Sequence, residues 1–266
     1  MLVLKGYTLP LSPNGIANHV SAPPWHFVGD LLVIEFWADP EAAAATLPDR
    51  LVPHEDSGRM TAMFIDWQSC GDTRSELRDP IRAQYREFLV TVAATHNGRD
   101  VAYCPYIWVT ADFSLVRGLI QGFPKKLGSV AVTRAYDVES PASPGLKKGA
   151  TFCGTAAAND RRLASGSVTL DHTTEAPSPH FTVPIVNMRY FPRLDAGHHG
   201  DPAVHELVRV AANDRSFSEI WEGDAELELY ETPDDELGAL APLRVGRGFR
   251  FSYAYSVNDL KILEQL

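Results

Sequence analysis

Residues 85–110 read YREFLVTVAATHNGRDVAYCPYIWVT, and this stretch indicates the fold class of the chain. Its two halves, 85–95 and 100–110, are rich in β-branched and aromatic residues, as strands are, and turn-forming residues lie between them. Eight further segments have the same character: 31–38, 59–67, 129–138, 151–158, 162–172, 180–191, 225–231 and 249–257. The sequence therefore predicts a mostly β fold, either two sheets or a barrel, folded around a pocket.

Few helices are expected. Residues 38–48 predict one, with Asp39 as N-cap, Pro40 in the first turn, a run of alanines and a terminating Pro48. A second short helix is predicted over 112–120. The 266 residues contain no repeats and no long linker, so we expect a single domain over residues 1–266.

The composition restricts the class of function. A formal net charge of −10 and a pI of about 5.3 argue against binding to nucleic acid or to an anionic membrane, where a basic face is expected. The three cysteines are scattered, as in a reducing compartment. The N-terminus has no signal-peptide pattern, and the longest apolar run, 31–38, is too short to span a membrane. We therefore expect a cytoplasmic protein. His198, His199 and His205 lack metal-site spacing, so neither a metal nor a cofactor is predicted.

Two adjacent lysines stand out in GLIQGFPKKLG, residues 118–128. The chain has only six lysines among its 24 basic residues, and arginine cannot lose its proton in a protein whereas lysine can. Lys147 and Lys148 lie in a polar, glycine-flanked turn, but Lys125 and Lys126 have apolar neighbours. The alternative interpretation of the second pair is a hairpin edge with charged gatekeeper residues.

An activated amine is the functional interpretation of the pair. A lysine with a pKa near 10.4 is almost fully protonated at neutral pH, but repulsion by a second ammonium or burial in apolar surroundings lowers that pKa. On an extended segment the two side chains would point to opposite faces, so that burial would be the larger cause. The free amine could then attack a ketone and form a Schiff base.

The segment GFPKKLG (122–128) resembles the active-site signature of the acetoacetate decarboxylase family. Three weaker segments, 38–53, 85–88 and 221–231, resemble further parts of that family in the right order. The resemblance implies that Lys125 forms the Schiff base, that Lys126 is its cationic neighbour, which lowers its pKa, and that Glu87 is a carboxylate of the pocket. It also implies a closed, mostly antiparallel β-barrel or double-sheet fold with few short helices, assembled into homo-oligomers of four or more copies.

Departures from the family pattern change the expected substrate. Decarboxylases of the family carry an arginine in the first strand region, whereas this chain has none before Arg50 and places Gly29 or Asp30 there. Two glutamates of the pattern are also absent; Thr61 is nearest to the first, and Leu119 or Ile120 replaces the second. Divergent members that this sequence resembles act as aldolase–dehydratases on pyruvate and similar 2-oxo acids, and this is the activity we predict.

Such a reaction needs groups that orient oxygen atoms and move protons. Gln121, four residues before Lys125, and Tyr255, near the end of the strand 249–257, are the candidates beside Glu87; Tyr253 is expected in the core. The predicted partners are a small 2-oxo acid and an aldehyde, used in either direction. A β-keto-acid decarboxylase and a non-catalytic small-molecule binder are the alternatives.

Overall fold

The computed structural model describes residues 3–266 and is mostly β, as predicted. The α-helices are α1 (Pro40–Ala45), α2 (Asp112–Ile120) and α3 (Pro179–Thr182). The strands are β1 (Trp25–Trp37), β2 (Val52–Pro53), β3 (Arg59–Gly71), β4 (Gln84–His96), β5 (Arg99–Val109), β6 (Lys125–Leu127), β7 (Ser129–Val132), β8 (Thr151–Ala158), β9 (Arg161–Thr174), β10 (Val186–Phe191), β11 (Val204–Phe217), β12 (Ile220–Leu229) and β13 (Arg244–Gln265). No helix in this part of the chain is long and apolar enough to cross a membrane.

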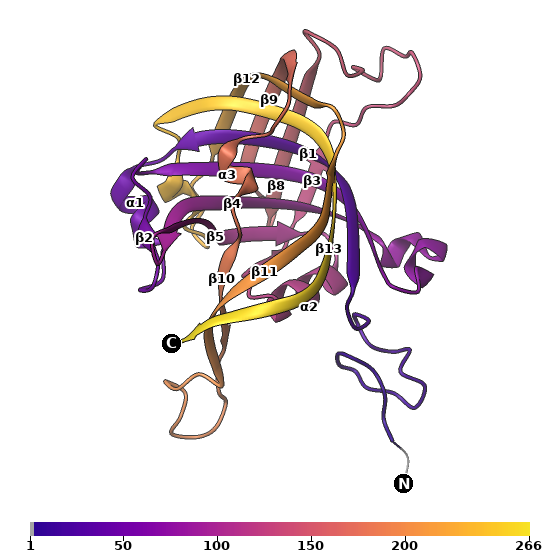
Figure 1. Ribbon diagram of the computed structural model, residues 1–266, viewed down its shortest axis with the longest axis vertical. Helices are drawn as coiled ribbons and strands as arrows, with labels where there is room; N and C mark the ends of the chain where they lie inside the picture. The colour runs from indigo at the N-terminus through magenta and orange to yellow at the C-terminus, as the bar shows by residue number, and fades with distance from the viewer. Residues whose placement is uncertain (1–2) are drawn as a thin grey trace.

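One large sheet organises the molecule. Its strand order is β6-β5-β4-β3-β1-β13-β12-β9-β8-β7, and β11 pairs with β13 and carries β10 beside this path (Figure 1). All these pairs are antiparallel except β5 with β6, which run parallel. A parallel pair needs a crossover connection, and α2 with the turn after it provides this connection.

The sheet is not a closed barrel, so that part of the prediction was wrong. The path ends at β6 on one side and at β7 on the other, and no ladder in residues 3–266 joins these two strands. They are consecutive in the chain, separated only by Gly128, and follow each other end to end. Two segments of one extended stretch cannot lie side by side, so the seam between them has no hydrogen-bond ladder.

The central strands β1, β3 and β4 are buried on both faces. Along β1, Leu32 and Ile34 enter one hydrophobic core, whereas Leu31 and Val33 enter another. This double burial explains why the sequence of β1 is a nearly continuous apolar run rather than an alternating one. The second core, on the face of Leu31 and Val33, surrounds the site described below.

The segment 180–191 and the strand β11 differ from the sequence-based expectation. Residues 180–191 were predicted as one strand, but the chain forms the short helix α3 and only then strand β10. β11 was not predicted, because its second half, around Asn213 to Ser216, is exposed and polar. Pairing with β10 and β13 makes it a strand. β10 and β11 cross in front of β5 (Figure 1), where Ala102 and Ile185 form an isolated bridge.

Candidate active site

Lys125 is held on the buried side of the short strand β6. It pairs with Ile107 of β5, while Lys126 pairs with Trp108. Ile107 belongs to the core around the site and Trp108 to the opposite core, so consecutive residues of β6 face different sides of the sheet. The Lys125 side chain is only 7% exposed. Its Nζ donates hydrogen bonds to Glu87 Oε2 at 2.7 Å and to Ser114 Oγ at 3.1 Å.

Glu87 comes from the first half of β4, two strands away from β6 in the sheet. Its neighbours Phe88 and Val90 enter the other core, so the strand alternation points Glu87 to the Lys125 side. The carboxylate receives a second hydrogen bond from Trp67 Nε1 at 3.2 Å. A carboxylate this buried is satisfied by a cation and an indole N–H, and its orientation is fixed by both.

Helix α2 provides the opposite wall of the lysine site. Arg117, Gly118 and the C-cap residue Gln121 lie three, four and seven residues after Ser114, so the four residues share one buried side of the helix. Gly118 is essential for the close approach of the helix, because a Cβ at this position would lie 2.2 Å from Lys125 Cδ. Gly118, the first glycine of GLIQG, thus leaves space for the aliphatic part of the Lys125 side chain.

Burial lowers the pKa of Lys125 from its usual value, as the sequence predicted for an extended segment. The Glu87 carboxylate opposes this shift, and the nearby Arg117 guanidinium adds to it. Lys126 is not the responsible cation, and this correction follows from the strand geometry. Its Nζ lies over the Trp108 ring and pairs with Asp235 on the opposite, exposed side.

A cavity of about 360 Å³ adjoins the lysine site. It is lined by Glu87, Gln121 and Tyr255, three of the four predicted catalytic residues, and the fourth, Lys125, is bonded to Glu87. Apolar side chains such as Leu31, Met63, Ile65 and Phe181 form much of the rest of the wall. An apolar pocket with few polar groups beside a buried amine is the usual form of a small-molecule site.

Tyr255 is fixed by aromatic contacts on three sides. Its ring stacks on Phe27 at 4.7 Å and on Tyr253 at 5.2 Å, and it meets the Trp67 ring edge-on at 5.8 Å. Burial raises the pKa of the phenol well above its usual range, so the group is a neutral proton donor at physiological pH. Tyr253, expected in the core, is buried beside it.

Gln121 follows α2 directly and is buried at the edge of the cavity. Its Nε2 donates to the Arg117 carbonyl oxygen at 3.2 Å, one helical turn back. This bond fixes the amide plane. The side chain is therefore a rigid polar group in an otherwise apolar part of the wall, as its position in GLIQG suggested.

Three residues of the site were not predicted from the sequence: Ser114, Arg117 and Trp67, which donates to Glu87. Arg117 is 4% exposed and donates from Nη2 to Ser69 Oγ at 3.1 Å. Its guanidinium lies over the Phe27 ring at 4.5 Å. Ser114 and Arg117 share a helical spacing with Gln121, which was the available signal in the sequence. That this side of α2 faces Lys125 is known only from the structure.

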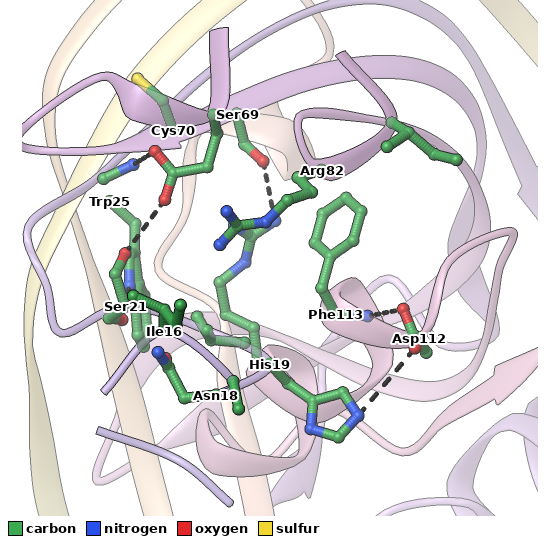
Figure 2. Close-up of a pocket in the computed structure, with 16 residues that line it drawn as sticks. Ile16, Asn18, His19, Ser21, Trp25, Ser69, Cys70, Arg82, Asp112 and Phe113 are labelled. Carbon is green, nitrogen blue, oxygen red and sulfur yellow. Dashed lines mark hydrogen bonds and ion pairs between the residues drawn. The ribbon is translucent and has the colours of Figure 1, made fainter. Parts of the chain in front are cut away.

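A second cavity, of about 430 Å³, lies on the other side of Arg117. Figure 2 shows it between the end of β3, with Ser69 and Cys70, and the start of α2, with Phe113. The N-terminal segment around His19 covers part of it. Of the predicted site residues, none lines this cavity.

Gly29, one of the two positions where the sequence comparison expected the family arginine, packs directly against an aromatic ring. A Cβ on Gly29 would lie 2.4 Å from Trp67 Cε3 and 2.7 Å from the Asp66 carbonyl oxygen. No side chain of any size fits there without moving β3. Asp30 pairs instead with Arg250 at 2.8 Å, and Thr61 is buried.

The family model for acetoacetate decarboxylase (ADC) matches residues 8–266. The chain belongs to the acetoacetate decarboxylase family. Acetoacetate decarboxylase 1 of Bradyrhizobium diazoefficiens is 26% identical over 232 residues, which cover 84% of this chain and 79% of that protein.

Two proteins of known structure are similar to this chain over almost its whole length. The enduracididine biosynthesis enzyme MppR, complexed with the condensation product of pyruvate and imidazole 4-carboxaldehyde, is 36% identical with a TM-score of 0.93, covering 99% of this chain and 98% of that one. MppR has also been solved with pyruvate. An acetoacetate decarboxylase-like enzyme from Sphingomonas wittichii RW1 is 29% identical with a TM-score of 0.90, covering 98% of this chain and all of that one.

Proposed function

We propose that this protein is a lyase that forms a Schiff base between Lys125 and pyruvate, or a similar 2-oxo acid, and condenses it with an aldehyde. The observation that carries the proposal is the buried Lys125 amine, bonded to Glu87 and Ser114 beside a cavity that Gln121 and Tyr255 also line. The similarity to MppR, whose structures contain pyruvate and its condensation product with an aldehyde, supports the choice of substrates.

The first half of the reaction makes the nucleophile. Lys125 transfers a proton to Glu87 across the 2.7 Å hydrogen bond, and the free amine adds to C2 of the 2-oxo acid. Loss of water from the carbinolamine leaves an iminium. Glu87 is placed to carry the protons of this step and to accept the proton that leaves C3, which gives the enamine.

The second half joins the aldehyde. C3 of the enamine attacks the aldehyde carbon, and the neutral phenol of Tyr255 supplies a proton to the resulting alkoxide. Loss of the second C3 proton and of the hydroxyl group as water forms the double bond. Hydrolysis of the iminium then frees Lys125 and an α,β-unsaturated 2-oxo acid. Gln121 orients the oxygen atoms through its fixed amide.

Decarboxylation of a β-keto acid is the second candidate. The family match and the Bradyrhizobium relative favour it, and its Schiff base would form on the same lysine. Against it, Gly29 and Trp67 leave no space for a cation at one of the two positions where the family arginine was expected. Release of carbon dioxide from acetoacetate separates the two reactions.

Borohydride trapping tests the proposal. The protein is incubated with pyruvate or acetoacetate, reduced, and examined by intact mass and peptide mapping; Lys125→Met and Lys126→Met serve as the matched pair. We expect a pyruvate adduct on Lys125 that Lys126→Met retains and Lys125→Met loses, and an unsaturated product when an aldehyde is added. Absence of any adduct would refute the nucleophile, whereas release of carbon dioxide from acetoacetate without aldol product would establish the decarboxylase.

A further inference from the structure

The positive and negative charges around the 360 Å³ cavity beside Lys125 do not cancel. Four of the residues that line this cavity have acidic or basic side chains: Glu87, His180, Arg209 and Arg215. Burial lowers the pKa of His180 to about 3, so its ring is neutral. Glu87 is neutralised by Lys125. The two arginines therefore leave the cavity positive in a protein whose formal net charge is −10.

Arg209 is the less constrained of the two. It lies in the first half of β11, is partly buried, and lines the cavity. Within residues 3–266, its guanidinium makes no hydrogen bond, ion pair or aromatic contact. A partly buried cation without a partner is an unfavourable arrangement that an anionic ligand would relieve.

Arg215 is already held by the protein. Its Nε donates to the Tyr253 hydroxyl at 2.9 Å and its Nη1 to the Thr182 carbonyl oxygen at 3.2 Å, both of them neutral acceptors. No carboxylate of the described chain lies within 4.0 Å of the guanidinium, so the protein does not offset its positive charge. Arg215 therefore adds positive potential to the cavity, while Arg209 is free to bind.

The carboxylate of a 2-oxo acid attached to Lys125 would lie near Arg117, the arginine whose charge acts on Lys125. That carboxylate is bonded directly to the imine carbon, so it stays close to Lys125 Nζ. Neither guanidinium that lines the cavity contacts Lys125, Glu87 or Gln121 in the described structure. The cavity is also larger than a three-carbon acid requires. The two arginines are thus available to the second substrate.

We infer that the aldehyde partner carries an anionic group, a carboxylate or a phosphate, and that Arg209 binds this group. The inference rests on the proposed function for the identity of the second substrate. Arg209 thus determines specificity rather than catalysis: it places the aldehyde carbon toward the enamine through a charge-assisted hydrogen bond at the far end of the molecule. Neutral aldehydes of the same shape lose this contact and leave the guanidinium unpaired.

A pair of isosteric aldehydes tests the inference. 4-Carboxybenzaldehyde and its neutral amide, 4-formylbenzamide, are compared as partners of pyruvate by the absorbance of the conjugated product. We expect kcat/KM to favour the acid at least tenfold, and the ratio to fall toward one in Arg209→Gln but not in Arg209→Lys. Arg99→Gln, which replaces an exposed arginine at the start of β5, is the control and should leave the ratio unchanged.

Binding without chemistry separates this inference from the proposed function. 4-(Hydroxymethyl)benzoate and its amide cannot condense, and their affinities are measured by calorimetry for the wild type and Arg209→Gln. A preference for the acid that needs Arg209 supports the site even if no pyruvate adduct is trapped. Equal affinities and equal rates for acid and amide would overturn the inference, as would a preference that survives Arg209→Gln or depends on Arg215 alone.

Discussion

Lys125 and Lys126 are neighbours in the chain, yet their amino groups lie on opposite sides of the sheet. Lys125 Nζ is buried between Glu87 and Ser114, whereas the Lys126 side chain is half exposed and its Nζ pairs with Asp235. The alternation of side chains along β6 enforces this separation. Adjacent lysines in the signature therefore do not imply adjacent ammonium groups, and the cation that influences Lys125 comes from another element, Arg117 of α2.

Removal of Arg117 and removal of Lys126 should affect the pH dependence of Schiff base formation differently. The Arg117 guanidinium disfavours the Lys125 ammonium and so lowers its pKa. Arg117→Met should therefore raise the pKa of Lys125 and move the half-maximal rate of imine formation with pyruvate to higher pH. Lys126→Met should leave this midpoint in place. A shift caused by Lys126→Met and none by Arg117→Met would contradict the structure.

Glu87→Gln should separate the two roles of Glu87. The carboxylate stabilises the Lys125 ammonium and so raises its pKa; without it, the pKa should fall further and the midpoint of imine formation should move to lower pH. Turnover to the unsaturated product should nevertheless drop by about 10²-fold or more, because a proton carrier is lost. Stopped-flow imine formation and steady-state turnover measure the two effects. Unchanged turnover would remove Glu87 from the proton path.

Gly118→Ala should disable the lysine while the fold survives. The added methyl group would overlap the stem of Lys125, and overpacking of this kind costs about 1–3 kcal/mol. We expect borohydride trapping on Lys125 to fall at least tenfold with a modest decrease in Tm. Gly200→Ala is the matched control, since a methyl group there meets nothing within 4 Å. Normal trapping in Gly118→Ala would mean that Lys125 has a second accessible position.

Tyr255→Phe should spare the first half of the reaction and slow the second. The ring still stacks on Phe27, but the neutral phenol that protonates the alkoxide is gone. Trapping with pyruvate should remain within about twofold, whereas formation of the unsaturated product should fall by about 10²- to 10⁴-fold. Tyr190→Phe, an exposed tyrosine on β10, provides the comparison. Equal losses in both steps would indicate a packing role only.

The local pattern of the sequence determined much of the architecture. Helix α2 begins and ends where it was predicted, and so does strand β8, because turn residues and apolar periodicity are local signals. The lowered pKa of Lys125 was also predictable, since burial of an amine among apolar residues disfavours its charged form. β11 and the open seam at Gly128 could not, because both depend on which strands pair.

Tertiary structure decided how the groups around Lys125 come together. Glu87, which the family resemblance had named, lies on β4, Ser114 on α2, and Trp67, which donates to Glu87, on β3. Only the pairing of β3, β4, β5 and β6, with α2 packed against them, brings these groups to one site. Electrostatic effects depend on distance in space and on burial, and neither can be read from sequence spacing. The sequence by itself therefore indicated Lys125 as the candidate nucleophile, while the fold decided that Arg117, and not Lys126, is the cation that acts on it.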